Sequence, residues 1–491
     1  MRLQLTVPVL ALLLAVTACG GDDGATPSPT GGSPSATASR TPGRGSGLNL
    51  SGTPRTEGAA VETSEGRIVT RLPASACVET TTTPLVVGEY AVFATHKKTP
   101  KPDDPNGDDG ECRNDPVKPG LYAVSLATGE AYTLSEASAE GTATYVDGTI
   151  IQPLLGDANV MFWRDGKAET VDLLSAGIDS AGLWDSRESV FVAGTLNSPF
   201  DQCQAPVNAD CGAMIAVTGD GDLVHRLDRN NGFRAWVTGG VTTDGERYYV
   251  GTGMGLDGDS VPGWAPECQV LALSKTLEVE AGYDDGTYQC TSIGRLESAV
   301  VGELPIAGDD MWVQYVGSTN GGPFTPVVRL SVRDLHVICR AEIPAVPWQA
   351  TALYYQAPVI DAEGNAWVVT ATSDNGMNAT IIRISPECGR QIFVSTTATR
   401  ASTPTLADDR YILVAWDGKL HVIDRQTAEM TDYELGEREQ VIGGAVVSEY
   451  GVTVVGESGT VTTFTDTGIK GYGSDPWPRF RKDNYGSATA P

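Results

Sequence analysis

The sequence predicts an all-β fold, a β-propeller built from four-stranded blades. Short stretches rich in β-branched and aromatic residues alternate apolar with polar positions, and Asp-Gly, Gly-Asp, Glu-Gly or Asn-Gly turns interrupt them every few residues. Similar strand-turn-strand units also recur at spacings of 39 to 57 residues, a period that is typical of propeller blades. The composition, with 57 Gly, 29 Pro and 41% hydrophobic residues in a chain of 491, fits a globular protein.

The first element is an export signal, residues 1–18. A single charge, Arg2, precedes an apolar run from Leu3 to Val16, which is shorter than the about 20 residues that a membrane span requires. The run ends in Val16-Thr17-Ala18-Cys19, which resembles the lipobox of bacterial lipoproteins and implies cleavage before Cys19 with acyl chains on its thiol and amino group. We therefore expect lipidation at Cys19; the alternative is an ordinary cleaved signal peptide.

The second element, residues 19–56, is a tether. It consists mostly of Gly, Ser, Thr, Pro and Ala, a composition that cannot bury enough apolar surface to order itself. A flexible coil of this length holds a folded domain on the order of 30 Å from the lipid surface. No second apolar run of membrane length follows in the sequence, so we expect a protein anchored by lipid alone to the extracytoplasmic face of the cell membrane.

The third element, residues 57–491, is the propeller domain. Its repeated outer hairpins begin, in order, at Leu121, Met161, Met214, Val270, Val327, Ile381, Leu420 and Val461. Each follows an inner hairpin of similar form, such as TPLVVGEYAVFAT before the first and TPTLADDRYILVAW before the seventh. An inner and an outer hairpin together make one four-stranded blade, so the sequence predicts eight blades, with seven as the alternative.

Both ends of the domain are expected to help close the ring. The strand-like segment from Gly66 to Ala74 lies outside the eight units, and propellers commonly build one blade from both ends of the chain. We therefore expect this segment to pair near the C-terminal tail. In the tail, Trp477 and Phe480 are predicted to cover blade edges that would otherwise expose apolar surface.

Two stretches resemble one propeller family. The unit LYAVSLATGE from Leu121 and the tail WPRFRKDNYG from Trp477 resemble the repeat and the terminal element of the pyrroloquinoline-quinone-type (PQQ-like, quinoprotein-like) propellers. That family contains quinoprotein dehydrogenases and also binding scaffolds, such as the propeller lipoprotein of the outer-membrane barrel-assembly machinery. The dehydrogenases stack their quinone on a disulfide between adjacent cysteines, and this sequence has no Cys-Cys pair. We therefore expect no cofactor-binding residues and no bound quinone.

The remaining eight cysteines predict disulfides, because their number is even and the chain is predicted to be exported. Eight cysteines allow 105 connectivities, and closure of local loops favours consecutive pairs. The argument applies best to Cys203 and Cys211, which share one predicted loop, and least to Cys339 and Cys388, which lie 49 residues apart. The expected pairs are Cys77–Cys112, Cys203–Cys211, Cys268–Cys290 and Cys339–Cys388.

No catalytic or metal-binding motif stands out in the sequence. His225, His336 and His421 are predicted to lie within strands and His96 at the end of one, and none forms a nucleophile motif. No pair of close cysteines suits zinc. The acidic loop from Asp103 to Glu111 spaces its oxygens as a calcium loop does but lacks the glycine and the bidentate glutamate, so a solvated loop is the favoured interpretation and calcium the weaker one.

Loop lengths indicate a binding surface. Long connections between second and third strands are predicted at Lys97–Gly120, Thr195–Gly212, Met254–Glu267 and Ser318–Pro326, and Trp264 and Phe324 lie within them. The net charge of −28 excludes most of the surface from contact with nucleic acid. We therefore expect a non-catalytic binding or scaffolding module whose partner is an envelope protein or a cell-wall polymer. The alternative is an enzyme, either a quinoprotein-type dehydrogenase or an envelope carbohydrate hydrolase with paired carboxylates in the central channel.

Overall fold

A computed structural model describes most of the chain from Gly47 to Thr489. The residues outside the description are 1–46, 74–77, 81, 98–118, 138, 140, 155–157, 176–180, 196–212, 229–232, 234–235, 238, 254–269, 284–297, 320–321, 345–356, 373–377, 399, 437–438, 484 and 490–491. The described part is built of strands, turns and extended segments, and it contains no helix of a length and apolarity that could cross a membrane.

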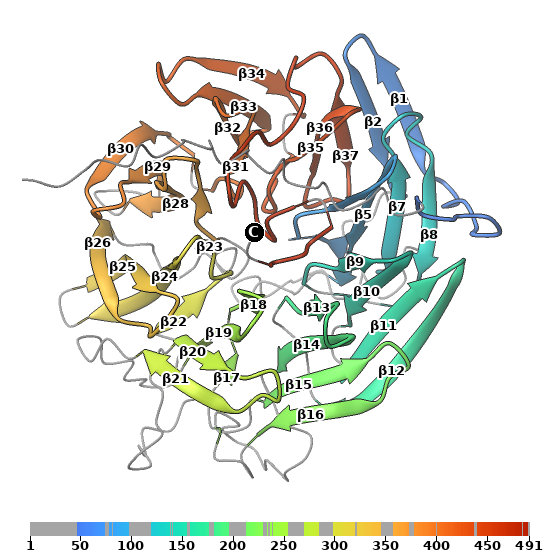
Figure 1. The fold of residues 1–491 in the computed structure, drawn as a ribbon. Coiled ribbons are helices and arrows are strands. Elements are labelled where there is room, and N and C mark those ends of the chain that lie inside the picture. Colours follow the sequence, from blue (N-terminus) through green and yellow to red (C-terminus); the bar gives the residue numbers. More distant parts are fainter. Residues whose placement is uncertain are drawn as a thin grey trace, which may run out of the picture. The chain divides into compact units, whose positions relative to one another are not determined.

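Eight four-stranded blades surround one axis, as the repeats predict (Figure 1). In each blade the strands are antiparallel and follow one another outward from the axis. The first four blades are β4 (Leu85–Val87), β5 (Tyr90–Ala94), β7 (Leu121–Ser125) and β8 (Ala131–Ser135); β9 (Thr144–Val146), β10 (Thr149–Pro153), β11 (Ala158–Arg164) and β12 (Lys167–Ser175); β13 (Leu183–Asp185), β14 (Val190–Thr195), β15 (Ala213–Thr218) and β16 (Leu223–Leu227); and β18 (Thr242–Thr243), β19 (Tyr248–Gly253), β20 (Val270–Leu273) and β21 (Val279–Tyr283).

The other four blades follow the same plan. They are β23 (Ile306–Ala307), β24 (Asp310–Thr319), β25 (Gly322–Ser331) and β26 (Val337–Pro344); β27 (Val359–Ile360), β28 (Ala366–Thr372), β29 (Asn378–Ile384) and β30 (Arg390–Ser395); β31 (Thr405–Ala407), β32 (Tyr411–Trp416), β33 (Lys419–Asp424) and β34 (Met430–Glu434); and β35 (Val446–Ser448), β36 (Gly451–Val455) and β37 (Val461–Phe464), completed from the N-terminal side. Smaller strands accompany them, namely β3 (Val78–Glu79) with β6 (His96–Lys97), β17 (Trp236–Val237) beside β19, and β22 (Ser298–Val301) between β19 and β24.

The N-terminal strands close the ring in the eighth blade. The strand β2 (Arg67–Arg71) pairs antiparallel with β37, and β1 (Ala60–Ser64) adds a fifth strand outside it. Val69 is buried and lies opposite Thr462. The expectation that the segment from Gly66 onward pairs near the C-terminal end is therefore confirmed.

The Asp-Gly turns explain why the hairpins are tight. Asp147-Gly148, Asp165-Gly166 and Asp417-Gly418 each join two strands through two residues that both have positive φ. That pair of dihedrals is the type I′ turn, which matches the twist of antiparallel strands and favours Asp followed by Gly.

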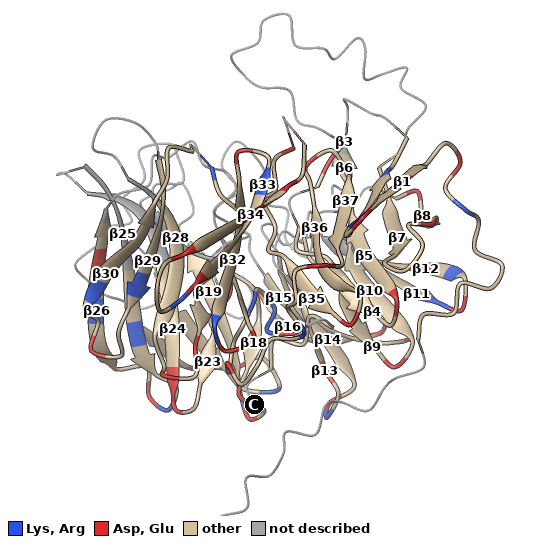
Figure 2. Ribbon diagram, turned by 90° about the horizontal axis from the view of Figure 1, so that it is seen from above, with Lys and Arg blue, Asp and Glu red and all other residues tan. Residues whose placement is uncertain are grey.

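Burial falls from the axis to the rim. All five residues of β36 are buried, whereas four of the five residues of β34 are exposed. The blades pack face to face through apolar side chains, and the largest of these clusters extends from the third blade to the sixth and includes Trp312 and Trp477. Inner strands therefore contribute most of the apolar burial, while the outer strands carry the charges visible at the rim (Figure 2).

One predicted loop is wrong. Residues Ser318–Pro326 do not form a long connection, because β24 and β25 continue as a hairpin until Thr319 pairs with Gly322. Phe324, which the sequence places in the predicted loop, instead lies on β25 opposite Gly317. The other three predicted loops, with Trp264 and the acidic loop Asp103–Glu111, lie wholly or mainly outside the described residues.

Candidate functional site

The centre of the ring is occupied by the C-terminal segment of the chain, residues 470–489, which we call the axial tail. Figure 1 shows this segment at the axis, in the middle of the ring. The prediction that Trp477 covers a blade edge is confirmed, since it is buried and bridges Ile360 on the innermost strand of the sixth blade, and Phe480 is buried beside Ala181 and Ala357. The centre of the ring is therefore built in part from the end of the chain itself.

The axial tail enters beside the turn between β31 and β32. The carboxylate of Asp408 accepts the backbone N–H of Lys470 and of Gly471, and that of Asp409 accepts the N–H and the hydroxyl of Ser474. Gly473 has φ of 74°, and a Cβ there would lie 2.3 Å from the Asp409 Oδ1. Only glycine fits this close approach.

The middle of the tail joins the sixth and seventh blades. Asp475 pairs with Arg425 at 3.1 Å and accepts the N–H of Ala362 at 2.9 Å. Trp477 exchanges backbone hydrogen bonds with Ile360, and the carbonyl of Pro478 accepts the N–H of Leu406. Burial raises the pKa of Asp475, although the Arg425 charge opposes the rise.

Two fully buried arginines hold the inner part of the tail. The guanidinium of Arg481 pairs with Glu303 at 2.7 Å, and the Arg481 N–H donates to the same carboxylate at 2.6 Å, with neither side chain exposed. Arg481 also donates to the carbonyls of Gly182, Val241 and Gly486. Burial raises the pKa of Glu303 above its ordinary value, against the opposing effect of the Arg481 charge.

Arg479 lies two residues earlier and reaches the opposite side of the ring. It donates to the carbonyl of Pro84 at 2.8 Å and to the hydroxyl of Tyr472 at 3.4 Å, and that hydroxyl also accepts the N–H of Val447. Burial raises the pKa of Tyr472, so its phenol stays protonated. The alternating arginines of the sequence R-F-R thus face different blades.

The last residues of the tail complete the set of contacts. The carbonyl of Tyr485 accepts the N–H of Tyr145, and the carbonyl of Ala488 accepts that of Thr243. The axial tail therefore makes hydrogen bonds to all eight blades: through Pro84, Tyr145, Gly182, Val241, Glu303, Ile360, Leu406 and Val447, in the order of the blades.

Three buried carboxylates in or beside the axial tail have partners within the protein. Glu303 and Asp475 bind arginines, and Asp361 accepts hydrogen bonds from the Asn365 amide, the Asn365 N–H and the Trp367 indole. Each is thus held by donors from its own surroundings. Within the described ranges no three His, Cys, Asp or Glu side chains lie close enough together to hold a metal ion.

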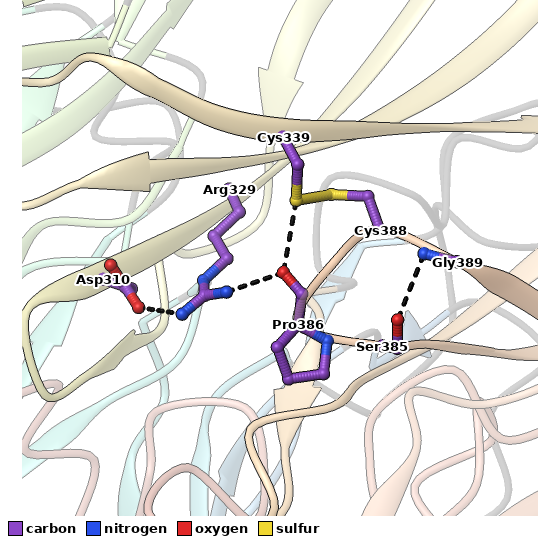
Figure 3. Close-up of a disulfide and its surroundings, with 7 residues drawn as sticks. All are labelled: Asp310, Arg329, Cys339, Ser385, Pro386, Cys388 and Gly389. Carbon is purple, nitrogen blue, oxygen red and sulfur yellow. Dashed lines mark hydrogen bonds and ion pairs between the residues drawn. A yellow bond between two sulfur atoms is a disulfide. The ribbon is translucent and has the colours of Figure 1, made fainter. Parts of the chain in front are cut away.

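One of the predicted disulfides lies within the described residues. Cys339 on β26 bonds to Cys388 in the turn between β29 and β30, so the cross-link joins the fifth blade to the sixth (Figure 3). Beside it, Arg329 pairs with Asp310 and donates to the carbonyl of Pro386. Cys19 and the other six cysteines, Cys77, Cys112, Cys203, Cys211, Cys268 and Cys290, lie outside the described residues.

The histidines are spread over the ring. His96 lies on β6 beside Glu79 at 3.1 Å, and His225 lies on β16. His421 on β33 is stacked on Trp416 and bonds Asp432 at 2.9 Å. The prediction that His336 lies in a strand is wrong, since it follows the turn after β25 and contacts Asp334 at 2.6 Å.

The pairing of Arg481 with Glu303 is not predicted from the sequence. The tail motif contains both arginines, and their alternation with apolar residues signals a buried, structural segment. Glu303 has no such signal, because a single glutamate between Gly302 and Leu304 resembles any turn residue. Only the closure of the ring brings it to the axis.

Among known proteins, solved structures are similar to this chain in fold, at low sequence identity. No protein-family profile matches the sequence, and no curated protein matches it. A europium-containing methanol dehydrogenase superposes with a TM-score of 0.49 at 13% identity, covering 78% of this chain and 84% of that one. A chain of the mitotic checkpoint complex gives 0.42 at 12%, covering 71% and 87%, and the WD40 β-propeller domain of Doa1 gives 0.36 at 9%, covering 67% and 97%. The propeller fold of this chain is established by its own strand pairing.

Proposed function

We propose that the protein is a lipid-anchored, extracytoplasmic β-propeller that acts as a non-catalytic binding or scaffolding module in the bacterial cell envelope. The observation that supports this proposal most directly is the axial tail. Two buried ion pairs, Glu303 with Arg481 and Asp475 with Arg425, join this tail to the blades at the axis, where a propeller enzyme would need convergent reactive groups. What remains for recognition is the outer surface and the loops.

The anchor rests on the sequence. An apolar run that is too short to span, ending in Val16-Thr17-Ala18-Cys19, supports cleavage and lipidation at Cys19, and the composition that follows supports a flexible tether. The partner in this proposal is an envelope protein or a cell-wall polymer. A chain with a net charge of −28 does not suit a nucleic acid.

The anchor is tested by the variant Cys19→Ser. We expect the wild-type protein in the membrane fraction with the mass of an acylated chain, and the variant without acyl chains. Crosslinking in intact cells, followed by mass spectrometry of the captured wild-type protein, then identifies the partner. A wild-type chain that carries no acyl group would contradict the anchor.

The non-catalytic role is tested on the full chain purified from its native host. Absorbance and mass spectrometry are recorded with and without added pyrroloquinoline quinone and calcium. We expect no bound quinone and no saturable spectral change, because the sequence lacks the adjacent cysteines on which quinoprotein dehydrogenases stack the cofactor. Either signal would contradict the scaffold proposal and indicate a dehydrogenase. Release of sugars from envelope carbohydrate would contradict it and indicate a hydrolase.

A further inference from the structure

Residues 48–56 cross the second and first blades before the chain enters the closing hairpin, and we call this segment the strap. In Figure 1 it lies in blue beside β8. Its first residue, Leu48, is buried in an apolar cluster shared by these two blades, together with Tyr145 and Trp163. The next residue, Asn49, donates to Asp165 in the turn between β11 and β12. Although its composition places it in the tether, the strap is therefore packed on the ring.

The second half of the strap pairs with the edge of the first blade. The Thr56 N–H donates to the carbonyl of Ala131 at 2.8 Å, and the Thr133 N–H donates to the carbonyl of Pro54 at 3.1 Å. The Thr56 and Thr133 hydroxyls lie 3.0 Å apart. These contacts cover part of the exposed edge of β8, which is a backbone edge that would otherwise stay open.

A salt bridge reinforces the same junction. Arg55 pairs with Glu130 at 2.8 Å, just before β8 begins. Both side chains are substantially exposed, so the pair adds little by itself. The buried leucine and the two backbone hydrogen bonds are the stronger fastenings of the strap.

The hairpin that follows the strap, β1 with β2, forms the outer edge of the eighth blade. β1 exposes all five of its residues and pairs only with β2, which pairs in turn with β37. A force applied directly to the start of β1 would first open the ladder between β1 and β2 and would then load the ladder between β2 and β37. Such local opening needs much less energy than global unfolding.

We propose that the strap is a strain-relief clamp, which transfers tension from the tether to the first and second blades and keeps it away from the closing hairpin. This inference deepens the proposed function, since it rests on the tether being attached to a surface at its far end. The strap is placed for this role because it lies between the tether and β1 and is fastened to two blades that do not contain the closing strand.

Single-molecule force spectroscopy on the chain from residue 19 onward tests the proposal. One handle is placed on the exposed turn residue Ala428 by a bio-orthogonal amino acid, and the other either at the N-terminus or at the exposed residue Glu57, just after the strap. The lifetime of the closed ring is then compared between the two pulling points at the same force. We expect it to be about tenfold shorter or more when the pull enters at Glu57, since the packing of Leu48 and two hydrogen bonds no longer oppose opening.

A variant gives the second comparison. Leu48→Ala combined with Thr56→Pro removes the buried side chain and one backbone donor, and we expect it to shorten the lifetime under N-terminal pulling toward the Glu57 value. The matched control Glu57→Ala changes an exposed side chain and should leave the lifetime unchanged. Equal wild-type lifetimes from both pulling points would overturn the clamp. Because no lipid is involved, that outcome would leave the anchor proposal to its own test with Cys19→Ser.

Discussion

Arg481 and Glu303 form an ion pair with no exposed surface at the point where several blades meet the axial tail. Removing one partner of such a pair strands a charge in the interior, which costs about 3–5 kcal/mol. We therefore expect Arg481→Met to lower the free energy of unfolding by that amount in urea denaturation. The control Lys470→Ala, on an exposed residue of the same tail, should change it by no more than about 0.5 kcal/mol.

A double variant distinguishes the electrostatic contribution of the ion pair from the packing contribution of its two side chains. Glu303→Leu together with Arg481→Met leaves no stranded charge, so its loss should be smaller than the sum of the two single losses. Additive losses would mean that the two groups act independently and that the pair itself is not what holds the tail.

The disulfide between Cys339 and Cys388 gives a second test at the scale of residues. It closes a loop of 49 residues and joins two blades, so the chain-entropy effect predicts a loss of about 2–4 kcal/mol when both cysteines become alanine. Unfolding followed by tryptophan fluorescence, with and without reductant, measures it. Reductant should move the wild-type midpoint toward that of the double variant, although other disulfides would add to this shift. A double variant as stable as the wild-type protein would contradict the prediction.

At the scale of elements, the axial tail is predicted to stabilise the whole ring. Truncation after Gly473 removes Arg479, Arg481 and Trp477, and with them hydrogen bonds to seven of the eight blades. We expect a large fall in the melting temperature, measured by circular dichroism. An unchanged melting temperature would show that the blades hold the ring without the tail.

The sequence predicts elements where the pattern is local and fails where the ring brings distant segments together. Asp-Gly turns and alternating Val, Ile and Tyr fix the hairpins, and so the number of blades follows. The position of Trp477 was predicted only as a cover for blade edges, because nothing in the tail says that it lies on the axis. The roles of Glu303 and Leu48 were not predicted for the same reason, since Arg481 lies 178 residues from Glu303 and the cluster around Leu48 includes residues of two blades, as distant in sequence as Trp163. The cysteine pair least favoured by local spacing, Cys339–Cys388, formed because adjacent blades bring both residues to one junction.

At the scale of the whole molecule, the carboxylates respond to acid in two opposite ways. The Arg410 guanidinium lowers the pKa of Asp424 to about 2, and His336 lowers that of Asp334 to about 2. Burial alone would raise the pKa of Asp185, but hydrogen bonds from Lys275 and Tyr248 outweigh it and lower the value. Burial raises the pKa of Glu303 and Asp475 instead.

These directions fix the shape of the stability curve. A carboxyl whose pKa is lower in the folded chain binds its proton more weakly there, so it adds stability above its unfolded value near 4 and loses it as pH falls toward 2. Glu303 and Asp475, whose pKa values are raised in the folded chain, have the opposite effect. Their contribution to the free energy of unfolding increases as the pH falls through these raised pKa values. For the carboxyls whose pKa values are lowered, we therefore expect the urea midpoint to fall as the pH drops below about pH 4.

The variant Asp424→Asn isolates one component of the acid limb. It removes a group that contributes above pH 4 and nothing below pH 2, so the difference in urea midpoint between wild type and variant should shrink steadily across that interval. Asp417→Asn, in an exposed turn of the same blade, is the matched control and should follow the wild-type slope. A constant difference between wild type and Asp424→Asn from pH 5 to pH 2 would mean that the Arg410 contact does not shift the carboxyl, and that acid sensitivity arises elsewhere in the ring.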